Sequence, residues 1–217
     1  MLTLSLEKPG TASPKLRLSL NKGAQFTVRV EWHCDADHKD DVDVHALEAS
    51  NDGNGAKVTE LTSVLSTYNT KLMNPRGGAL AANPNGSFQT PSGGLSHSGD
   101  KRVQNNTETI LIDGSKLPAG VNEIPILVTV HEAEHGEGHE GGEEEEEEAA
   151  FGDIDECTIT LLDDAGKELG AYRLSEEFKE FNVVQLGSLL LGENGWEYAA
   201  VGNGFNGDFN DVLTHFS

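Results

Sequence analysis

Hydrophobic and polar residues alternate in several short stretches of the chain, which is the pattern of β-strands with one buried face. The strands predicted in this way span residues 2–6, 16–20, 26–32, 42–47, 109–112, 123–130, 157–162, 167–174, 181–191 and 196–201. Turn residues separate most of them, as at 51–55 and 163–166. Many short strands with short turns and little helix predict an all-β fold, in which two antiparallel sheets pack as a β-sandwich.

Three stretches depart from this alternation. Residues 61–68 fit either a short strand or a short helix. The stretch 74–94 is rich in Gly, Pro, Asn and Ser, which predicts a loop. Near the end of the sequence, Val212, Leu213 and Phe216 recur at helical spacing and predict a short helix.

Residues 131–150 read HEAEHGEGHEGGEEEEEEAA and form a low-complexity segment. Ten glutamates and three histidines lie within 131–148. Such a composition cannot bury apolar surface, so we expect a long, solvated acidic loop inserted into the sandwich. The length of 217 residues then suits a single domain over residues 1–217 that carries this insertion.

The chain is strongly acidic, with 15 basic and 37 acidic residues and a formal charge of −22. Without the ten insertion glutamates the charge would still be −12. A surface of this sign repels nucleic acids and anionic lipids, and it attracts cations and basic protein surfaces. No apolar run approaches the roughly 18 residues of a membrane helix, and no signal peptide is evident. We therefore expect a cytoplasmic protein with protein partners.

The residue types that serve nucleophilic catalysis are sparse. Cys34 and Cys157 form neither a disulfide framework nor a zinc pattern, and they predict two buried thiols on strands, with one disulfide between strands as the alternative. His33 and His45 lie on predicted strands, where packing is the simpler explanation. No G-x-S-x-G motif or phosphate-binding loop occurs. The sequence thus indicates a protein that is not an enzyme and has no small-molecule substrate.

Clustered carboxylates carry the main chemical signal. Five aspartates fall within Asp35–Asp43, at a junction between two predicted strands. Like charges at this density repel unless a cation neutralises them, and calcium accepts oxygen ligands in irregular loop geometry. A solvated acidic loop is the alternative, and a metal-dependent hydrolase built on this segment is a more remote one. A second cluster comprises Asp100, Asn105, Asn106 and Glu108, although Asp and Asn are also common in turns.

The order of several motifs resembles the TerD family of tellurium-resistance and calcium-binding stress proteins. The matching segments are Trp32–Asp35, Asp41-Val-Asp43-Val-His-Ala46, His97-Ser-Gly-Asp100, Lys116-Leu-Pro118, Phe151-Gly152 and Gly195-Trp196 with Gly202-Asn-Gly204. They occur in the family's order over roughly residues 15–217. This collinearity is more specific than any single motif.

The resemblance implies a β-sandwich that holds Ca²⁺ in loops near one end. On this sequence the implied ligands are Asp41, Asp43, Asp100 and Glu108, with Asn105 and Asn106 as secondary candidates. The implied function is non-enzymatic: a calcium-binding protein, associated with stress or tellurite resistance, that acts through protein–protein interaction. The loop after Asp100 is shorter than the family's, and Asn106 and Thr107 stand at acidic positions, which would weaken calcium binding.

The weakened loop and the long insertion favour one alternative function. The chain could be a structural component of a larger assembly, such as a phage particle, and would then be located in a virion. The two functions differ in the partner, because an assembly component binds its neighbours in the particle.

The insertion also has a metal-binding interpretation. His131, His135 and His139 recur every four residues, and their imidazoles could bind zinc, nickel or copper weakly. The interspersed glycines oppose the helix that would align the three histidines. A solvated loop without a metal is the alternative.

Overall fold

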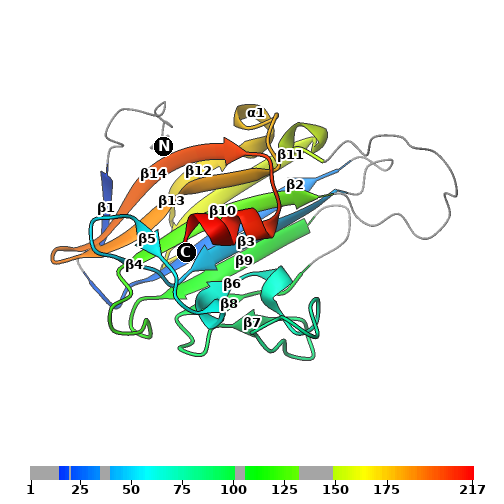
Figure 1. Ribbon diagram of the computed structural model, residues 1–217. Helices are drawn as coiled ribbons and strands as arrows, with labels where there is room; N and C mark the ends of the chain where they lie inside the picture. Colours follow the sequence, from blue (N-terminus) through cyan, green and yellow to red (C-terminus); the bar gives the residue numbers. More distant parts are fainter. Residues whose placement is uncertain (1–14, 20, 35–39, 101–105, 132–148) are drawn as a thin grey trace, which may run out of the picture.

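The computed structural model describes residues 15–19, 21–34, 40–100, 106–131 and 149–217, and these ranges hold all the structural observations that follow (Figure 1). The predicted strand at 2–6 and most of the His/Glu insertion lie outside the described residues. Within the described ranges, no helix is long and apolar enough to cross a membrane.

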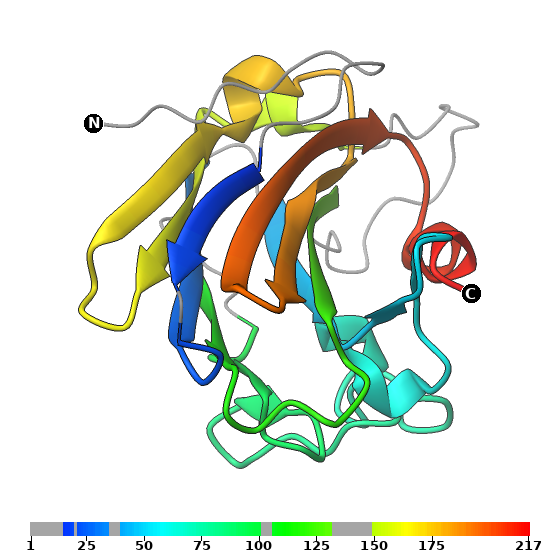
Figure 2. The ribbon, with the colours of Figure 1, turned by 90° about the vertical axis from the view of Figure 1, so that its left-hand side faces the viewer.

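Two six-stranded antiparallel sheets form the body of the molecule (Figures 1 and 2). In the first sheet the strand order is β1 (Lys15–Ser19), β14 (Gly195–Phe205), β13 (Val183–Gly192), β10 (Glu123–His131), β3 (Asp41–Leu47) and β6 (Val64–Leu65). In the second sheet it is β12 (Glu168–Arg173), β11 (Glu156–Asp163), β2 (Gln25–His33), β9 (Asn106–Asp113), β8 (Leu95–His97) and β7 (Phe88–Gln89). The predicted all-β sandwich is confirmed.

The remaining elements are short. They are the two-stranded ribbon of β4 (Ser50–Asn51) and β5 (Ala56–Lys57), the helices α1 (Leu174–Glu177) and α2 (Phe209–His215), and the 3₁₀ turns η1 (Leu61–Ser63), η2 (Thr67–Asn69) and η3 (Phe151–Asp153). The helix predicted near the end of the sequence is α2. The stretch 61–68, for which the sequence allowed either a strand or a helix, contains both, because strand β6 lies between the 3₁₀ turns η1 and η2.

The hydrophobic residues that alternate with polar ones along each strand are buried between the two sheets. Along β2, Phe26, Val28, Val30 and Trp32 are buried, while the residues between them are exposed or half-buried. Ile110 on the adjacent strand β9 is also in this core. Successive side chains of a strand point to opposite faces, so the apolar positions of both sheets meet in one layer.

β3 is buried on both faces. Val42 and Val44 belong to the core between the sheets. Leu47 belongs to a second, smaller apolar cluster with Val212 and Phe216 of α2. The helix α2 therefore covers the outer face of the first sheet next to β3, where it is drawn in red in Figure 2. The backbone N–H of Val58, just after β5, donates to the carbonyl of Phe216 and ties this helix to the ribbon.

Cys34 and Cys157 are free, buried thiols, so the prediction of buried thiols is confirmed and the alternative of a disulfide is not. Cys157 lies on β11, as predicted, whereas Cys34 follows the end of β2. Burial and the nearby Asp40 carboxylate raise the pKa of the Cys34 thiol to about 11. Burial also raises the pKa of Cys157. Both side chains are therefore neutral thiols near neutral pH.

Trp196 joins the two sheets and provides a test of this packing. Its side chain on β14 is fully buried, meets the Phe26 ring edge-on at 5.7 Å, and donates from Nε1 to the Lys22 carbonyl at 2.9 Å. Trp196→Ala should lower the free energy of unfolding by about 3–5 kcal/mol, because it leaves a large cavity. Trp196→Phe, which keeps an aromatic ring, should lose clearly less. Urea denaturation measures both, and equal losses would contradict this role of the ring.

Candidate metal centre

Several strands begin or end at the same end of the sandwich. Asp41, the first residue of β3, is paired with His131, the last residue of β10. Asn106, the first residue of β9, is paired with Trp32 near the end of β2. Because β2 leads into β3 along the chain, both sheets contribute strand ends to this region.

Three carboxylates from both sheets converge here. Asp43 comes from β3, Glu108 from β9, and Asp100 from the segment after β8. One carboxylate oxygen of each lies within 4.8 Å of the others. Asp43 and Glu108 are buried and Asp100 is half-buried. The structure thus brings together three of the residues that the sequence indicated as calcium ligands.

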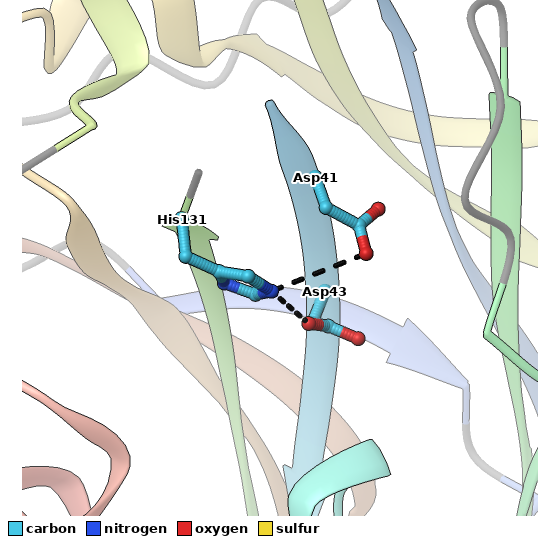
Figure 3. A group of neighbouring side chains, drawn as sticks. All are labelled: Asp41, Asp43 and His131. Atoms are coloured by element: carbon cyan, nitrogen blue, oxygen red, sulfur yellow. Dashed lines mark ion pairs between the residues drawn. The ribbon is translucent and has the colours of Figure 1, made fainter. Parts of the chain in front are cut away.

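Asp43 also belongs to a second group, with Asp41 and His131 (Figure 3). The Nε2 atom of His131 lies 3.2 Å from Oδ2 of Asp43 and 4.0 Å from Oδ2 of Asp41. Figure 3 shows the three side chains pointing toward one another, two from β3 and one from the end of β10. The sequence indicated both aspartates, but it grouped His131 with His135 and His139, which lie outside the described residues.

Strand geometry explains why these side chains gather. Asp41, Asp43 and His45 alternate with Val42 and Val44, so they share the face of β3 opposite to the core. The antiparallel register then places His131 directly beside Asp41. Side chains of directly paired residues on neighbouring antiparallel strands are close enough to touch.

His45 lies two residues after Asp43 on the same face of β3. Its Nε2 atom lies 3.0 Å from the Thr129 hydroxyl on β10, and the side chain is buried. Burial lowers the pKa of His45 to about 4, against the opposing effect of the Asp43 charge. His45 is therefore neutral near pH 7 and does not neutralise the aspartates.

Glu108 has a histidine neighbour of its own. The Nδ1 atom of His97 accepts a hydrogen bond from the Gly99 backbone at 3.0 Å, so the ring proton is on Nε2 when His97 is neutral. That atom lies 3.2 Å from Oε2 of Glu108, and both side chains are buried. Burial lowers the pKa of His97 to about 4, and its ring stacks on Phe88 at 4.6 Å. A neutral, fixed imidazole thus lies beside the Glu108 carboxylate, without the geometry of a hydrogen bond between Nε2 and Oε2.

Sequence reasoning missed Tyr68, which reaches the site from η2. Its hydroxyl donates to Oδ2 of Asp43 at 3.0 Å and lies 2.7 Å from the ring nitrogens of His131. Its ring is 5.4 Å from that of Phe209 in α2, and the Phe209 ring is 5.3 Å from His45. Tyr68 therefore connects the carboxylates to the C-terminal helix. No local motif marks it, because residues 61–68 lie far from both clusters in sequence.

The electrostatics of the two aspartates on β3 differ. Burial raises the pKa of Asp41 to about 7, and the charges of Asp43 and Asp100 act in the same direction. Burial alone would also raise the pKa of Asp43, but the hydrogen bond with His131, together with the charge that His45 carries only at low pH, lowers it well below its ordinary value. Without a cation, Asp43 is thus charged near neutral pH while Asp41 retains a substantial share of its proton.

The donor set fits a divalent cation. Asp43, Asp100 and Glu108 offer carboxylate oxygens from both sheets at mutual distances that one ion can span. Oδ1 of Asp43 is buried and has no hydrogen-bond partner among the described residues. A buried carboxylate oxygen without a donor is costly, and coordination to a cation would satisfy it.

Of the two secondary candidates for calcium ligands, the structure describes Asn106 but not Asn105. Asn106 is buried at the start of β9, two residues before Glu108, so their side chains share one face of the strand. Asn105 lies outside the described residues, as do Asp35 and Asp37 of the aspartate-rich segment.

Comparison with known proteins places this arrangement in context. The profile of the TerD domain matches residues 83–216. The chain is 31% identical over 124 residues to the uncharacterized protein YceE of Bacillus subtilis, a match that covers 55% of this chain and 59% of YceE. It is 23% identical over 129 residues to general stress protein 16U of the same bacterium, covering 58% and 61%. It is 26% identical over 128 residues to tellurium resistance protein TerD of Serratia marcescens, covering 57% and 61%. In each case the matched region is less than two thirds of the relative's length.

Two solved structures share the fold. A Streptomyces coelicolor A3(2) homologue of the telluride resistance protein TerD, SCO6318, superposes with a TM-score of 0.60 at 14% identity, over 88% of this chain and 95% of that one. The protein of unknown function SAV2460 superposes with a TM-score of 0.61 at 10% identity, over 89% and 96%. At these identities the likeness is one of fold.

The raised pKa of Asp41 predicts how stability depends on pH. In chelator-treated protein the folded state holds a proton on Asp41 up to about pH 7, whereas the unfolded chain releases it near pH 4. The contribution of Asp41 to the free energy of unfolding therefore falls as the pH rises from 4 to 7. Asp41→Asn should stabilise the metal-free protein at pH 8 by up to about 4 kcal/mol, and at pH 5 by only about 1.5 kcal/mol.

Asp113→Asn is the matched control for this measurement. The Ser115 hydroxyl and Lys116 lower the pKa of Asp113 to about 2, so its contribution to stability is fully present at both pH values. Its replacement should destabilise the protein equally at pH 5 and pH 8. Thermal unfolding of both variants in chelator decides the question: a destabilised Asp41→Asn protein at pH 8 would contradict the assignment.

Proposed function

The chain belongs to the TerD domain family, and on this premise we propose that it is a calcium-binding protein of stress and tellurium resistance that acts by binding other proteins. Relatives in the family carry names of both kinds, general stress protein 16U and tellurium resistance protein TerD. The observation that carries the calcium proposal is the group of Asp43, Asp100 and Glu108, whose oxygens lie within 4.8 Å of one another.

Calcium suits this group better than other common cations. Ca²⁺ takes six to eight oxygen ligands at about 2.3–2.6 Å and tolerates irregular geometry. Three carboxylates at a strand end leave positions for backbone carbonyls, water and the amide oxygen of Asn106. The two carboxylates on β3 and β9 are held by regular strands and the third by the segment after β8, so the site is largely pre-formed.

Calcium would join the two sheets at this end of the sandwich. Asp43 belongs to the first sheet and Glu108 to the second. An ion held between them removes the repulsion of buried like charges and adds a cross-sheet connection. Because the ion binds the folded protein and not the unfolded chain, it stabilises the fold in proportion to its free concentration.

A protein partner is supported by the segment that carries Tyr68. Among the described residues, five large hydrophobic side chains are exposed, and three of them, Leu61, Leu72 and Met73, lie within residues 61–73. Patches of exposed apolar side chains are typical of binding surfaces, and these three residues are near one another in sequence. Through Tyr68, which contacts Asp43, ion binding can order this segment and present it to a partner with a basic, partly apolar surface.

The cysteines favour binding over catalysis. Cys34 and Cys157 are buried, and both have raised pKa values. The thiolate is the reactive form of cysteine, so neither residue is suited to nucleophilic attack.

Glu108→Gln should abolish the effect of calcium on stability. In the native protein, Ca²⁺ at about 100 times its Kd should add about 2.7 kcal/mol, which raises Tm by roughly 5–10 °C for a domain of this size. Glutamine retains the shape of Glu108 but lacks the charge, so the shift should be lost. Differential scanning calorimetry with and without Ca²⁺ measures both proteins.

Glu168→Gln is the control, because Glu168 is exposed on the edge strand β12. It makes the same change of charge and should keep the full calcium shift. A native protein whose Tm is unchanged at millimolar Ca²⁺, with no calcium found by elemental analysis, would refute the proposal.

A further inference from the structure

The chain contains five Asn-Gly pairs, and each is a candidate for spontaneous covalent change. They are Asn54-Gly55, Asn85-Gly86, Asn194-Gly195, Asn203-Gly204 and Asn206-Gly207. Asparagine is a thermally labile residue, because the backbone nitrogen of the next residue can attack its side-chain carbonyl carbon. Glycine has no Cβ to shield that nitrogen. The fold then decides which pair reacts, because the backbone must rotate to bring the two atoms together.

Two of these glycines are held by hydrogen bonds. The Gly86 N–H donates to the carbonyl of Asn83 at 2.9 Å. The Gly207 N–H donates to Oδ1 of Asn182 at 3.0 Å. Each nitrogen is therefore turned toward its acceptor, and attack on the preceding side chain requires local opening of the structure.

Two further pairs belong to the hairpin of β13 and β14. Asn203 and Gly204 lie inside β14, where both are paired with residues of β13. Gly195, the first residue of β14, is paired with Gly192 and is buried. Strand pairing opposes the backbone rotation that the attack requires, so these asparagines are protected until the hairpin opens.

The fifth pair, Asn54-Gly55, has no such protection. Both residues are exposed in the loop 52–55, which joins β4 to β5 (Figure 1). Gly55 has a φ of 109°, and nothing lies within 4 Å of the position that a Cβ would take. Among the described residues, the N–H groups of Gly53 and Asn54 have acceptors within the ribbon, whereas that of Gly55 has none. Its nitrogen is therefore accessible and free to turn toward the Asn54 side chain.

We propose that Asn54 is the site at which the folded chain modifies itself, losing ammonia to become an aspartyl or isoaspartyl residue. The Gly55 nitrogen bonds to Cγ of Asn54, the bond from Cγ to Nδ2 breaks, and ammonia leaves with the proton that the Gly55 nitrogen gives up. The product is a succinimide ring. Water, the co-reactant, then adds to one of the two ring carbonyls and opens the ring. Opening at Cγ gives an aspartyl residue, and opening at the backbone carbonyl gives an isoaspartyl residue, in which the main chain runs through the former side chain.

Modification changes the charge and the length of this loop. Either product replaces a neutral amide by a carboxylate next to Asp52, whose Oδ1 accepts from the Asn54 amide at 3.1 Å. Repulsion between two like charges then takes the place of that hydrogen bond. The isoaspartyl product also lengthens the backbone between the paired residues Asn51 and Ala56. Its exposed carboxylate is the group that protein isoaspartyl methyltransferases methylate, so an enzyme of that class is the partner that the modified loop fits.

Ageing of the folded, full-length chain at mildly alkaline pH tests this assignment. Peptide mapping by electron-transfer mass spectrometry, which distinguishes isoaspartyl from aspartyl residues, follows all five pairs over time. We expect product at residue 54 to accumulate before product at the other four, and faster as the pH rises, because the attacking nitrogen must lose its proton. An isoaspartyl methyltransferase with labelled S-adenosylmethionine should place its label on the peptide that contains residue 54.

Two variants and one unfolded sample are the controls. Asn54→Gln should lose the product, because the longer side chain would have to close a larger ring, and Asn85→Gln should leave the reaction at residue 54 unchanged. In guanidinium chloride all five pairs should react at comparable rates, because the protection by the fold is gone. Product at residue 85 or 206 of the folded chain that forms as fast as product at residue 54 would overturn the assignment. So would a residue 54 that reacts only in the unfolded chain. The reaction is independent of the calcium site, so neither result bears on calcium binding.

Discussion

The repulsion between carboxylates at one end of the sandwich is the constraint on which the rest of the site depends. Folding brings Asp43 of the first sheet within 4.8 Å of Asp100 and Glu108, and it places Asp41 in a second group with Asp43 and His131. Burial then removes the water that would screen their charges. In the absence of a cation the protein responds by retaining a proton on Asp41, as its raised pKa indicates. A bound cation would be the other solution, and it would convert an unfavourable cluster into a connection between the sheets.

Neutral groups surround these charges. His97 and His45 are buried with lowered pKa values, so they add little positive charge near neutral pH. Tyr68 donates to Asp43 and also contacts Phe209 of α2. The state of the aspartates is thereby connected to a helix and to a segment with exposed apolar side chains. An ion bound at Asp43 would therefore be connected to this segment through Tyr68.

The strands could be predicted from sequence because alternation directly reflects burial. The helix α2 could also be predicted, since Val212 and Phe216 occupy one face of it. The short elements α1, β4 and β5 have too few residues for a periodic signal. In the site, Asp43, Asp100 and Glu108 were marked by local clusters and by the order of motifs. The pairing of His131 with Asp41 depends on strand register. The contact of Tyr68 with Asp43 depends on tertiary packing. Neither can be recognised from the neighbouring sequence.

A crystal structure of protein grown with Ca²⁺ would show whether a calcium ion joins Asp43 of the first sheet to Glu108 of the second. Anomalous scattering distinguishes calcium from water, and the coordination distances identify its ligands. We expect an anomalous peak about 2.3–2.6 Å from oxygens of Asp43, Asp100 and Glu108. A well-ordered cluster with no such peak, and with water or a side-chain cation between these carboxylates, would contradict it.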